Sequence, residues 1–130
     1  MENIIFLKRQ ERLKEVLGHR GLDGILITNL TNIKYICGFT GSAASCLVTP
    51  EGNYFITDGR YIEQSKDQVV GFEIFIDMEP HLIQIKKNNF ISKESKLYFE
   101  SDHMSVSQYD NMVNLFPNVL WESSSMVLEN

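Results

Sequence analysis

The sequence predicts a single α/β domain: a mixed sheet of six strands with helices on both faces. An amphipathic segment at 4–20 precedes a wholly apolar run at 24–28, and a helix followed by a buried strand is typical of α/β layering. Two strand-like runs flank a Pro-Glu-Gly turn at 50–52, which predicts an antiparallel hairpin. Helical and strand patterns alternate after the hairpin, which predicts that part of the sheet is parallel.

The composition excludes several classes of protein. A chain of 130 residues with 43% hydrophobic and 22% charged residues is typical of one globular domain. The net charge of -5 disfavours nucleic-acid binding, which needs a basic face. There is neither a run of the about 18 apolar residues that cross a membrane nor the layout of a signal peptide. We therefore expect a cytoplasmic protein with no nucleic-acid or membrane partner.

The two cysteines also indicate a reducing compartment such as the cytoplasm. Cys37 and Cys46 lack a CxxC spacing, and two thiols cannot form a disulfide framework. Each is flanked by apolar or small residues, so we expect buried, free thiols, as in a reducing compartment.

The first half of the chain supplies two helices and the first strand. In the segment 4–20 the apolar stripe consists of Leu13, Val16 and Leu17, with Asn3 as a candidate N-cap and Gly21 as a candidate C-cap residue. The strand 24–28 follows. A short helix over 32–37, capped by Asn29 or Thr31, is expected to end at Gly38.

The hairpin occupies 44–49 and 53–57. Its turn places Pro50 at the second position and Gly52 where a left-handed conformation is needed. A helix over 60–70 follows, and Asp58 is placed to cap it.

The second half alternates strands and helices. Strands are predicted at 72–77, 96–100 and 119–122. Pro80 begins a helix that stops near Asn88, and Ser105 caps another that Pro117 ends. We divide the chain into a domain at 1–122 and the first turn of a further helix at 123–130, which indicates a continuation into a second domain.

Two glycine-containing loops, at 39–42 and 58–61, are the candidate functional region. Loops on a rigid sheet are where binding residues tend to lie, and Phe39, Arg60 and Tyr61 are large groups that such loops can present. Two interpretations of Arg60 stay open. It either reaches a carboxylate outside the domain or pairs with Asp58 or Glu63 at the helix start. The alternative interpretation of the loops is that they are ordinary turns with one aromatic side chain in the core.

No catalytic or metal-binding motif is present. His19, His81 and His103 belong to no metal-ligand pattern, and there is no phosphate-binding loop or nucleophile elbow. The carboxylates of Asp58, Asp77 and Glu100 follow predicted strands, but residues at such positions are more often caps than metal ligands.

The two loops carry a family resemblance. Residues 32–42 (NIKYICGFTGS) and 55–64 (FITDGRYIEQ) resemble the N-terminal domain of Xaa-Pro peptidases, the aminopeptidases and dipeptidases of the creatinase/prolidase family. The likeness covers nearly the whole chain, including 12–13, 24–29 and 71–73. Two departures are Cys37, where the family usually has a small hydroxyl residue, and Ser65, where alanine is common.

The resemblance implies a ribonuclease-H-like fold that precedes a catalytic "pita-bread" domain. There, two aspartates, a histidine and two glutamates hold two divalent metal ions (Mn, Co or Zn) that activate the water attacking the bond before proline. None of these ligands is in this chain, so we expect the chain alone to be inert. The implied partners are the C-terminal domain, further subunits in a homo-oligomer and a proline-containing peptide. The implied positions at the active-site mouth or an interface are Phe39, Thr40, Gly41, Ser42, Asp58, Arg60 and Tyr61.

Two alternatives remain at this level. The chain could be a free-standing peptide-binding or scaffolding module that has lost catalysis. It could also be the N-terminal domain of a creatinase-type amidinohydrolase.

Overall fold

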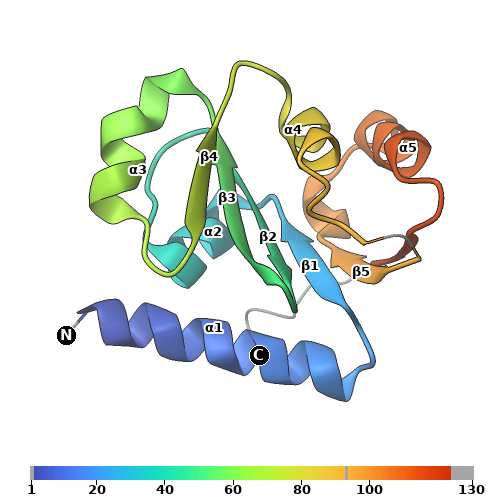
Figure 1. The fold of residues 1–130 in the computed structure, drawn as a ribbon, viewed down its shortest axis with the longest axis horizontal. Coiled ribbons are helices and arrows are strands. Elements are labelled where there is room, and N and C mark those ends of the chain that lie inside the picture. The colour runs from blue at the N-terminus through green and yellow to red at the C-terminus, as the bar shows by residue number, and fades with distance from the viewer. Residues whose placement is uncertain (1, 93, 124–130) are drawn as a thin grey trace.

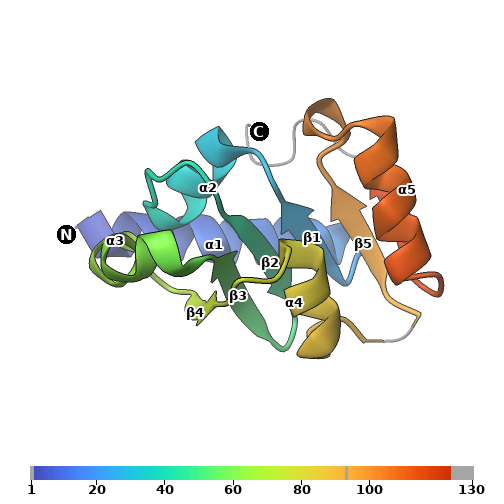
Figure 2. The same ribbon diagram turned by 90° about the horizontal axis from the view of Figure 1, so that it is seen from above.

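The computed structural model describes residues 2–92 and 94–123, which form one sheet covered by helices on both faces (Figures 1 and 2). The helices are α1 (Glu2–His19), α2 (Leu30–Cys37), α3 (Ile62–Gln68), α4 (His81–Lys87) and α5 (Val106–Leu115), with short 3-10 turns η1 (Gly59–Tyr61) and η2 (Ser101–His103). The strands are β1 (Gly24–Ile27), β2 (Ser45–Thr49), β3 (Gly52–Thr57), β4 (Glu73–Ile76), β5 (Lys96–Phe99) and β6 (Leu120–Ser123).

The strand order is β4-β3-β2-β1-β5-β6. β2 is antiparallel to both β1 and β3, whereas the pairs β3–β4, β1–β5 and β5–β6 are parallel. Every strand except β2 therefore ends at the same end of the sheet, which we call the carboxyl end, and β2 begins there. The opposite end, where β2 ends, is the amino end.

Alternating side chains of the strands build two separate cores. On one face Ile25, Val48 and Phe55 pack with Leu13 of α1 and Ile33 of α2. On the other face Leu26, Leu47, Ile56 and Phe99 pack with Ile85 of α4 and with Met112 and Phe116 of α5. The period of two along each strand thus divides the apolar residues between the faces, which confirms the predicted mixed α/β fold with helices on both faces.

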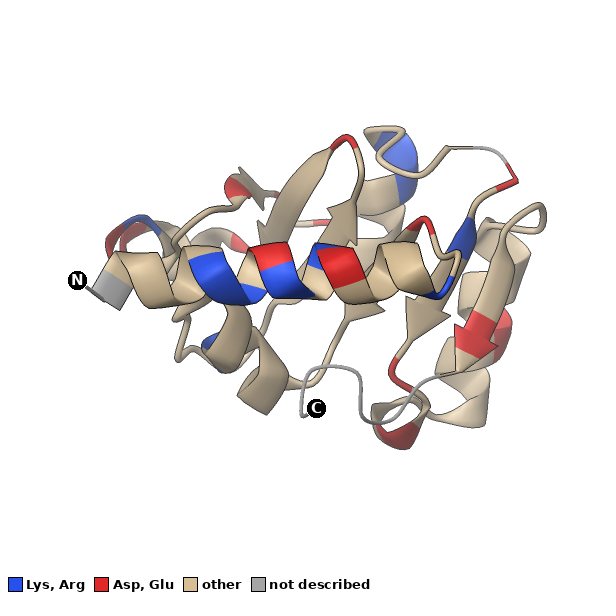
Figure 3. Cartoon of the chain, turned by 90° about the horizontal axis from the view of Figure 1, so that it is seen from below, with Lys and Arg blue, Asp and Glu red and all other residues tan. Residues whose placement is uncertain are grey.

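The exposed side of α1 is polar over most of its length. Basic and acidic residues are interspersed along it (Figure 3), and Lys8, Glu11, Arg12, Lys14 and Glu15 are exposed. Leu13 and Leu17 on the opposite side are 3% and 4% exposed, as the apolar stripe predicted.

The predicted caps are largely confirmed. Asn29 caps α2 by accepting a hydrogen bond from the Thr31 N–H, and Gly38 ends the helix at φ 91°. Gly21 follows α1 at φ 68°. Ser105 and Gln108 form a reciprocal capping box at α5.

Four local predictions are wrong. α1 begins at Glu2, so Asn3 lies inside the helix. Gly52 is the first residue of β3 and pairs with Thr49, without a left-handed φ, because the turn is already closed by Pro50 and Glu51. Asp58 caps the 3-10 turn η1 and not α3, which begins at Ile62. Ser123 belongs to β6, and the helix start predicted for 124–130 lies outside the described residues.

A search of the described helices finds none whose length and hydropathy would suit a membrane-crossing segment.

Candidate functional site

The loops 39–42 and 58–61 meet at the carboxyl end of the sheet, and we call them the loop pair. The Ser42 hydroxyl and the Tyr61 hydroxyl are hydrogen-bonded, and the Tyr61 ring lies edge-on to Phe39 with 5.5 Å between ring centroids. Below them the buried Thr57 hydroxyl donates to the Ala43 carbonyl at 2.6 Å. Two loops separated by a whole hairpin are therefore fixed to each other by side chains.

Phe39 anchors the first loop from inside. Its side chain is 1% exposed and contacts Phe55 edge-on, with centroids 4.9 Å apart. The expectation that the Phe39 ring is presented to a neighbour is thus wrong, because the ring fills the core on the α1 face. Gly41 packs directly on this ring, and a Cβ there would collide with Phe39 and lie 3.0 Å from the Tyr61 ring.

Helix α3 holds the first loop from the other side. The Thr40 N–H donates to Gln68 Oε1 at 2.9 Å, and the Thr40 hydroxyl accepts a hydrogen bond from Gln64 Nε2 at 3.1 Å. Thr40 is exposed, so these bonds close the outer rim of the loop pair.

Arg60 forms a bidentate ion pair with Asp58. Arg60 Nε donates to one Asp58 carboxylate oxygen and a terminal nitrogen donates to the other, both at 2.9 Å. These hydrogen bonds lower the pKa of Asp58 to about 2. Of the two interpretations of Arg60, the structure contains the pairing with Asp58. The Arg60 side chain nevertheless remains 68% exposed, so part of its guanidinium faces solvent.

Glu100 is buried at the same end of the sheet, where it binds the start of α2. It is 6% exposed and follows β5, and one carboxylate oxygen accepts from the N–H groups of Thr28 and Asn29 at 2.7 and 2.8 Å. The other oxygen accepts from the Asn32 side chain. Glu100 therefore supplies negative charge to the start of α2, where the helix dipole favours it.

Asp58, Asp77 and Glu100 do not meet at one point. Asp58 pairs with Arg60, Glu100 binds the start of α2, and Asp77 accepts from the N–H of Met78 at 2.6 Å. Among residues 2–92 and 94–123 no three His, Cys, Asp or Glu side chains are grouped as metal ligands.

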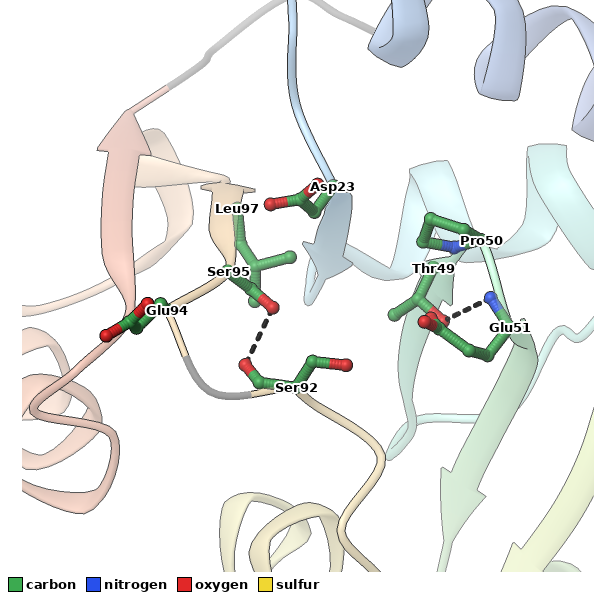
Figure 4. Close-up of a pocket in the computed structure, with 8 residues that line it drawn as sticks. All are labelled: Asp23, Thr49, Pro50, Glu51, Ser92, Glu94, Ser95 and Leu97. Carbon is green, nitrogen blue, oxygen red and sulfur yellow. Dashed lines mark hydrogen bonds between the residues drawn. The ribbon is translucent and has the colours of Figure 1, made fainter.

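A second acidic region lies at the amino end of the sheet, around a cavity of about 240 Å³ (Figure 4). Asp23, Glu51 and Glu94 surround it, but their carboxylates point in different directions in Figure 4. The Asp23 carboxylate accepts a hydrogen bond from the Lys96 N–H at 2.8 Å. Asp23, Glu51 and Glu94 lie in the short connections that precede β1, β3 and β5.

The two cysteines are buried side by side as free thiols. The Cys37 thiol donates to the Ile33 carbonyl at 3.2 Å, and burial raises the pKa of Cys46 well above its usual value. Buried free thiols were predicted from the apolar residues around them.

Sequence reasoning missed the polar contacts that build this end of the sheet. Asn32 and Glu100 are 68 positions apart, and Ser45 and His81 are 36 apart. No spacing rule links such pairs. The available signal was topological, since the residues after two adjacent parallel strands must lie near each other.

The fold and the loop pair define a class: an α/β domain that presents a fixed polar rim and holds no metal cluster among its described residues. The chain belongs to the creatinase/prolidase N-terminal domain family, whose model matches residues 9–130.

The relatives agree with this assignment. The uncharacterized peptidase YqhT of Bacillus subtilis is 44% identical over 100 residues, which are 76% of this chain and 28% of the relative. The Xaa-Pro dipeptidase from Bacillus anthracis superposes with a TM-score of 0.84 at 31% identity, covering 95% of this chain and 35% of that one. The N-terminal domain of the cytoplasmic peptidase PepQ from Mycobacterium tuberculosis superposes with a TM-score of 0.81 at 28% identity, covering 94% and 96%. The chain thus spans about a third or less of the length of the two longer relatives.

Proposed function

We propose that this chain is the supporting N-terminal domain of an Xaa-Pro metallopeptidase and that its loop pair borders the mouth of the active site. In this role the domain packs on its own C-terminal catalytic domain and on further subunits of a homo-oligomer. It limits access to short proline-containing peptides and performs no chemistry itself. A cytoplasmic location fits the relative described as cytoplasmic.

The observation that carries the proposal is the combination of rigidity and exposure in the loop pair. Phe39 holds the loops from the core and Gln68 from α3, yet the Arg60 guanidinium stays open to solvent. A side chain held in this way contacts a partner or substrate with little further loss of conformational entropy. Because Asp58 balances the charge of Arg60, the free guanidinium N–H groups suit a peptide carbonyl as well as a carboxylate.

The described residues do not form a site for the metal pair that the family implies. The five ligands, two aspartates, a histidine and two glutamates, would lie in the C-terminal domain. This chain would contribute substrate positioning only.

The test is to replace Arg60 by alanine in the full-length protein. We expect kcat/KM for an Xaa-Pro peptide to fall about tenfold with unchanged metal content, since losing one charge-assisted hydrogen bond costs roughly 1.5 kcal/mol. Lys66→Ala is the matched control, because Lys66 is an exposed cation on the neighbouring α3. Unchanged turnover in the Arg60 variant would reduce Arg60 to a structural role.

The alternative functions have a simple discriminator. A coding sequence that continues past Asn130 for about 200 residues, the scale of a further domain, and carries the five ligands supports the peptidase. A continuation without them favours the binding or scaffolding module. Turnover of creatine in place of Xaa-Pro peptides would favour the amidinohydrolase.

A further inference from the structure

Strand β4 forms one edge of the sheet, and its outer side is uncovered. It pairs with β3 on one side, and among residues 2–92 and 94–123 no strand lies beyond it. α3 and α4 lie on opposite faces of the sheet near β4, and neither crosses the outer edge (Figure 2). The unpaired polar groups of such an edge are a template for another strand.

The pairing with β3 fixes which peptide groups of β4 point outward. The Asp77 N–H donates to the Thr57 carbonyl at the end of β3, at 3.3 Å. Because successive residues of a strand point their N–H and C=O groups to opposite sides, the groups of Phe75 also face β3, and those of Ile74 and Ile76 face away. No turn or loop in the described part of the chain bonds to these outward groups. β4 therefore offers a donor and an acceptor at each isoleucine, in the spacing that another strand needs.

The edge lacks the devices that usually protect an edge strand. Natural edge strands are blunted by proline, lysine, a bulge or a covering element. The run Glu73–Ile76 contains neither proline nor lysine, and it pairs with Tyr54–Thr57 of β3 in unbroken register, without a bulge. Two of its residues are isoleucines, which as β-branched residues favour strand pairing. The outer side of β4 is thus open to strand addition.

Apolar side chains flank the edge on both faces of the sheet. On the α4 face the ring centroids of Phe75 and Phe90 are 4.6 Å apart, and Phe90 stacks on Tyr54 at 4.0 Å. On the α1 face Ile74 packs against the core and remains half-buried, as Phe75 does on its own face. A strand added to β4 would therefore cover apolar surface on both faces, which stabilises the pairing.

The two ends of β4 are acidic. Glu73 begins the strand and Asp77 follows it, and both are exposed. Neither carboxylate forms an ion pair with another residue of 2–92 or 94–123, because the lysine on this side, Lys87, pairs with Glu79 at 3.1 Å. Two unpaired negative charges therefore flank the apolar part of the edge.

The acidic ends decide which strand fits. In the antiparallel register that pairs the two isoleucines of one copy with those of a second copy, Glu73 would lie opposite Asp77 of the other copy. Like charges directly opposite each other destabilise a strand pair, so a second copy of this chain is a poor partner. A strand with a basic residue at each end is complementary in charge.

From these observations we propose that β4 binds an extended segment of another protein, which adds to the six-stranded sheet as a further, antiparallel edge strand. The side chains of this segment complement those of β4: basic residues opposite Glu73 and Asp77, an apolar residue opposite Phe75, and β-branched residues between them. Antiparallel pairing is the more stable arrangement per residue. Main-chain hydrogen bonds to the two isoleucines supply affinity, and the alternating side chains supply specificity.

The direct test is a titration of the chain with the peptide acetyl-Lys-Val-Phe-Val-Lys-amide, followed by ¹H–¹⁵N NMR and amide hydrogen exchange. We expect saturable shifts centred on β4 and slower exchange of the Ile74 and Ile76 N–H groups, which gain acceptors in the complex. The Phe75 N–H already faces β3, so its exchange should change much less. Absence of saturable shifts, or protection that leaves out Ile74 and Ile76, would overturn the proposal.

Two N-methylated forms of the peptide test the main-chain pairing. In the antiparallel register the N–H groups of both valines point to β4, and the N–H group of the phenylalanine points away. Methylation of the two valine nitrogens should abolish binding. Methylation of the phenylalanine nitrogen is the matched control and should leave the Kd nearly unchanged. An equal loss of affinity with both forms would contradict strand addition.

Charge variants test the recognition of the acidic ends. Glu73→Gln combined with Asp77→Asn should raise the Kd about tenfold, because two exposed ion pairs with the peptide are lost. Glu11→Gln combined with Asp110→Asn changes the net charge equally at exposed positions of α1 and α5, and should leave the Kd unchanged. Equal effects of the two double variants would show that net charge alone attracts the peptide, against the proposal.

A dilution series without the peptide tests a second copy as the occupant. We expect the exchange of the Ile74 and Ile76 N–H groups to be independent of protein concentration. Protection that grows with concentration would assign the edge to a second copy and overturn the choice of partner. None of these measurements involves peptidase activity, so the edge of β4 and the proposed role of the loop pair succeed or fail independently.

Discussion

The two ends of the sheet use acidic and hydroxyl residues in different ways. At the carboxyl end Glu100, Ser42 and Thr57 bond to residues far away in the sequence, so each contact joins separate elements. At the amino end Thr49 bonds to Glu51 and Ser95 to Ser92, within single turns, while the Asp23 carboxylate accepts from the more distant Lys96 N–H. The first pattern fixes loops in space, and the second mainly closes the short connections that precede the strands. Similar residue types thus build a candidate site at one end and ordinary turns at the other.

The largest effect should come from removing the carboxylate of Glu100. Glu100→Ala leaves two backbone N–H groups and the Asn32 side chain without their buried acceptor, and hydrogen bonds to charged groups contribute about 1.5–3 kcal/mol each. We expect the free energy of unfolding in urea to fall by about 3 kcal/mol. Glu51→Ala at the amino end, where the side chain is exposed, should change it by less than about 0.5 kcal/mol. Equal changes in the free energy of unfolding for the two variants would contradict this difference between the two ends of the sheet.

Two glycines of the loop pair should respond differently to the same substitution. Gly41→Ala forces the buried Phe39 ring to move, which we expect to cost about 1–3 kcal/mol, because overpacking a filled core strains it. Gly59→Ala has no neighbouring atom within 4 Å and no left-handed φ, so it should be close to neutral. Thermal unfolding of both variants measures the difference. A neutral Gly41→Ala would mean that Phe39 does not fix the loop.

A smaller effect is expected from the hydrogen bond between Ser42 and Tyr61. A double-mutant cycle with Ser42→Ala and Tyr61→Phe isolates it, and we expect a coupling energy of about 0.5–1 kcal/mol because the pair lies at the rim. Urea denaturation of the two single variants and the double variant provides the values. Additive effects would show that this hydrogen bond does not help to join the two loops.

The smallest effect concerns pH. The pKa of Asp58 is lowered to about 2, so the stabilisation from its pairing with Arg60 is complete above the ordinary carboxyl pKa and is lost as the pH falls through about 2. Carboxyl ¹³C NMR should show Asp58 titrating near 2, and Arg60→Ala should return its pKa toward the ordinary value. An Asp58 that titrates normally in the unmodified chain would contradict the ion pair.

Much of the architecture followed from local patterns. The short apolar or alternating runs and the turn at 50–52 predicted all six strands, and the caps at Asn29, Gly38 and Ser105 placed two helices to within two residues. Local prediction failed where a residue's role depends on a neighbour in space. Asn3 was expected to cap α1, but the helix begins one residue earlier. Gly52 was expected to adopt a left-handed conformation in the turn, but it pairs with Thr49 as part of β3.

The sequence by itself determined the fold class, the family and the place of the two loops, because periodicity, turns and short motifs are properties of adjacent residues. Only the tertiary structure decided that Phe39 is a core anchor, that Arg60 pairs with Asp58 and that Glu100 binds the start of α2. It also decided that β4 lies at an edge of the sheet, with the amide groups of Ile74 and Ile76 facing outward. The physical reason is that the strand order brings together segments that are tens of residues apart in the sequence. The partner of each hydrogen-bond donor and acceptor is fixed only after these segments have met.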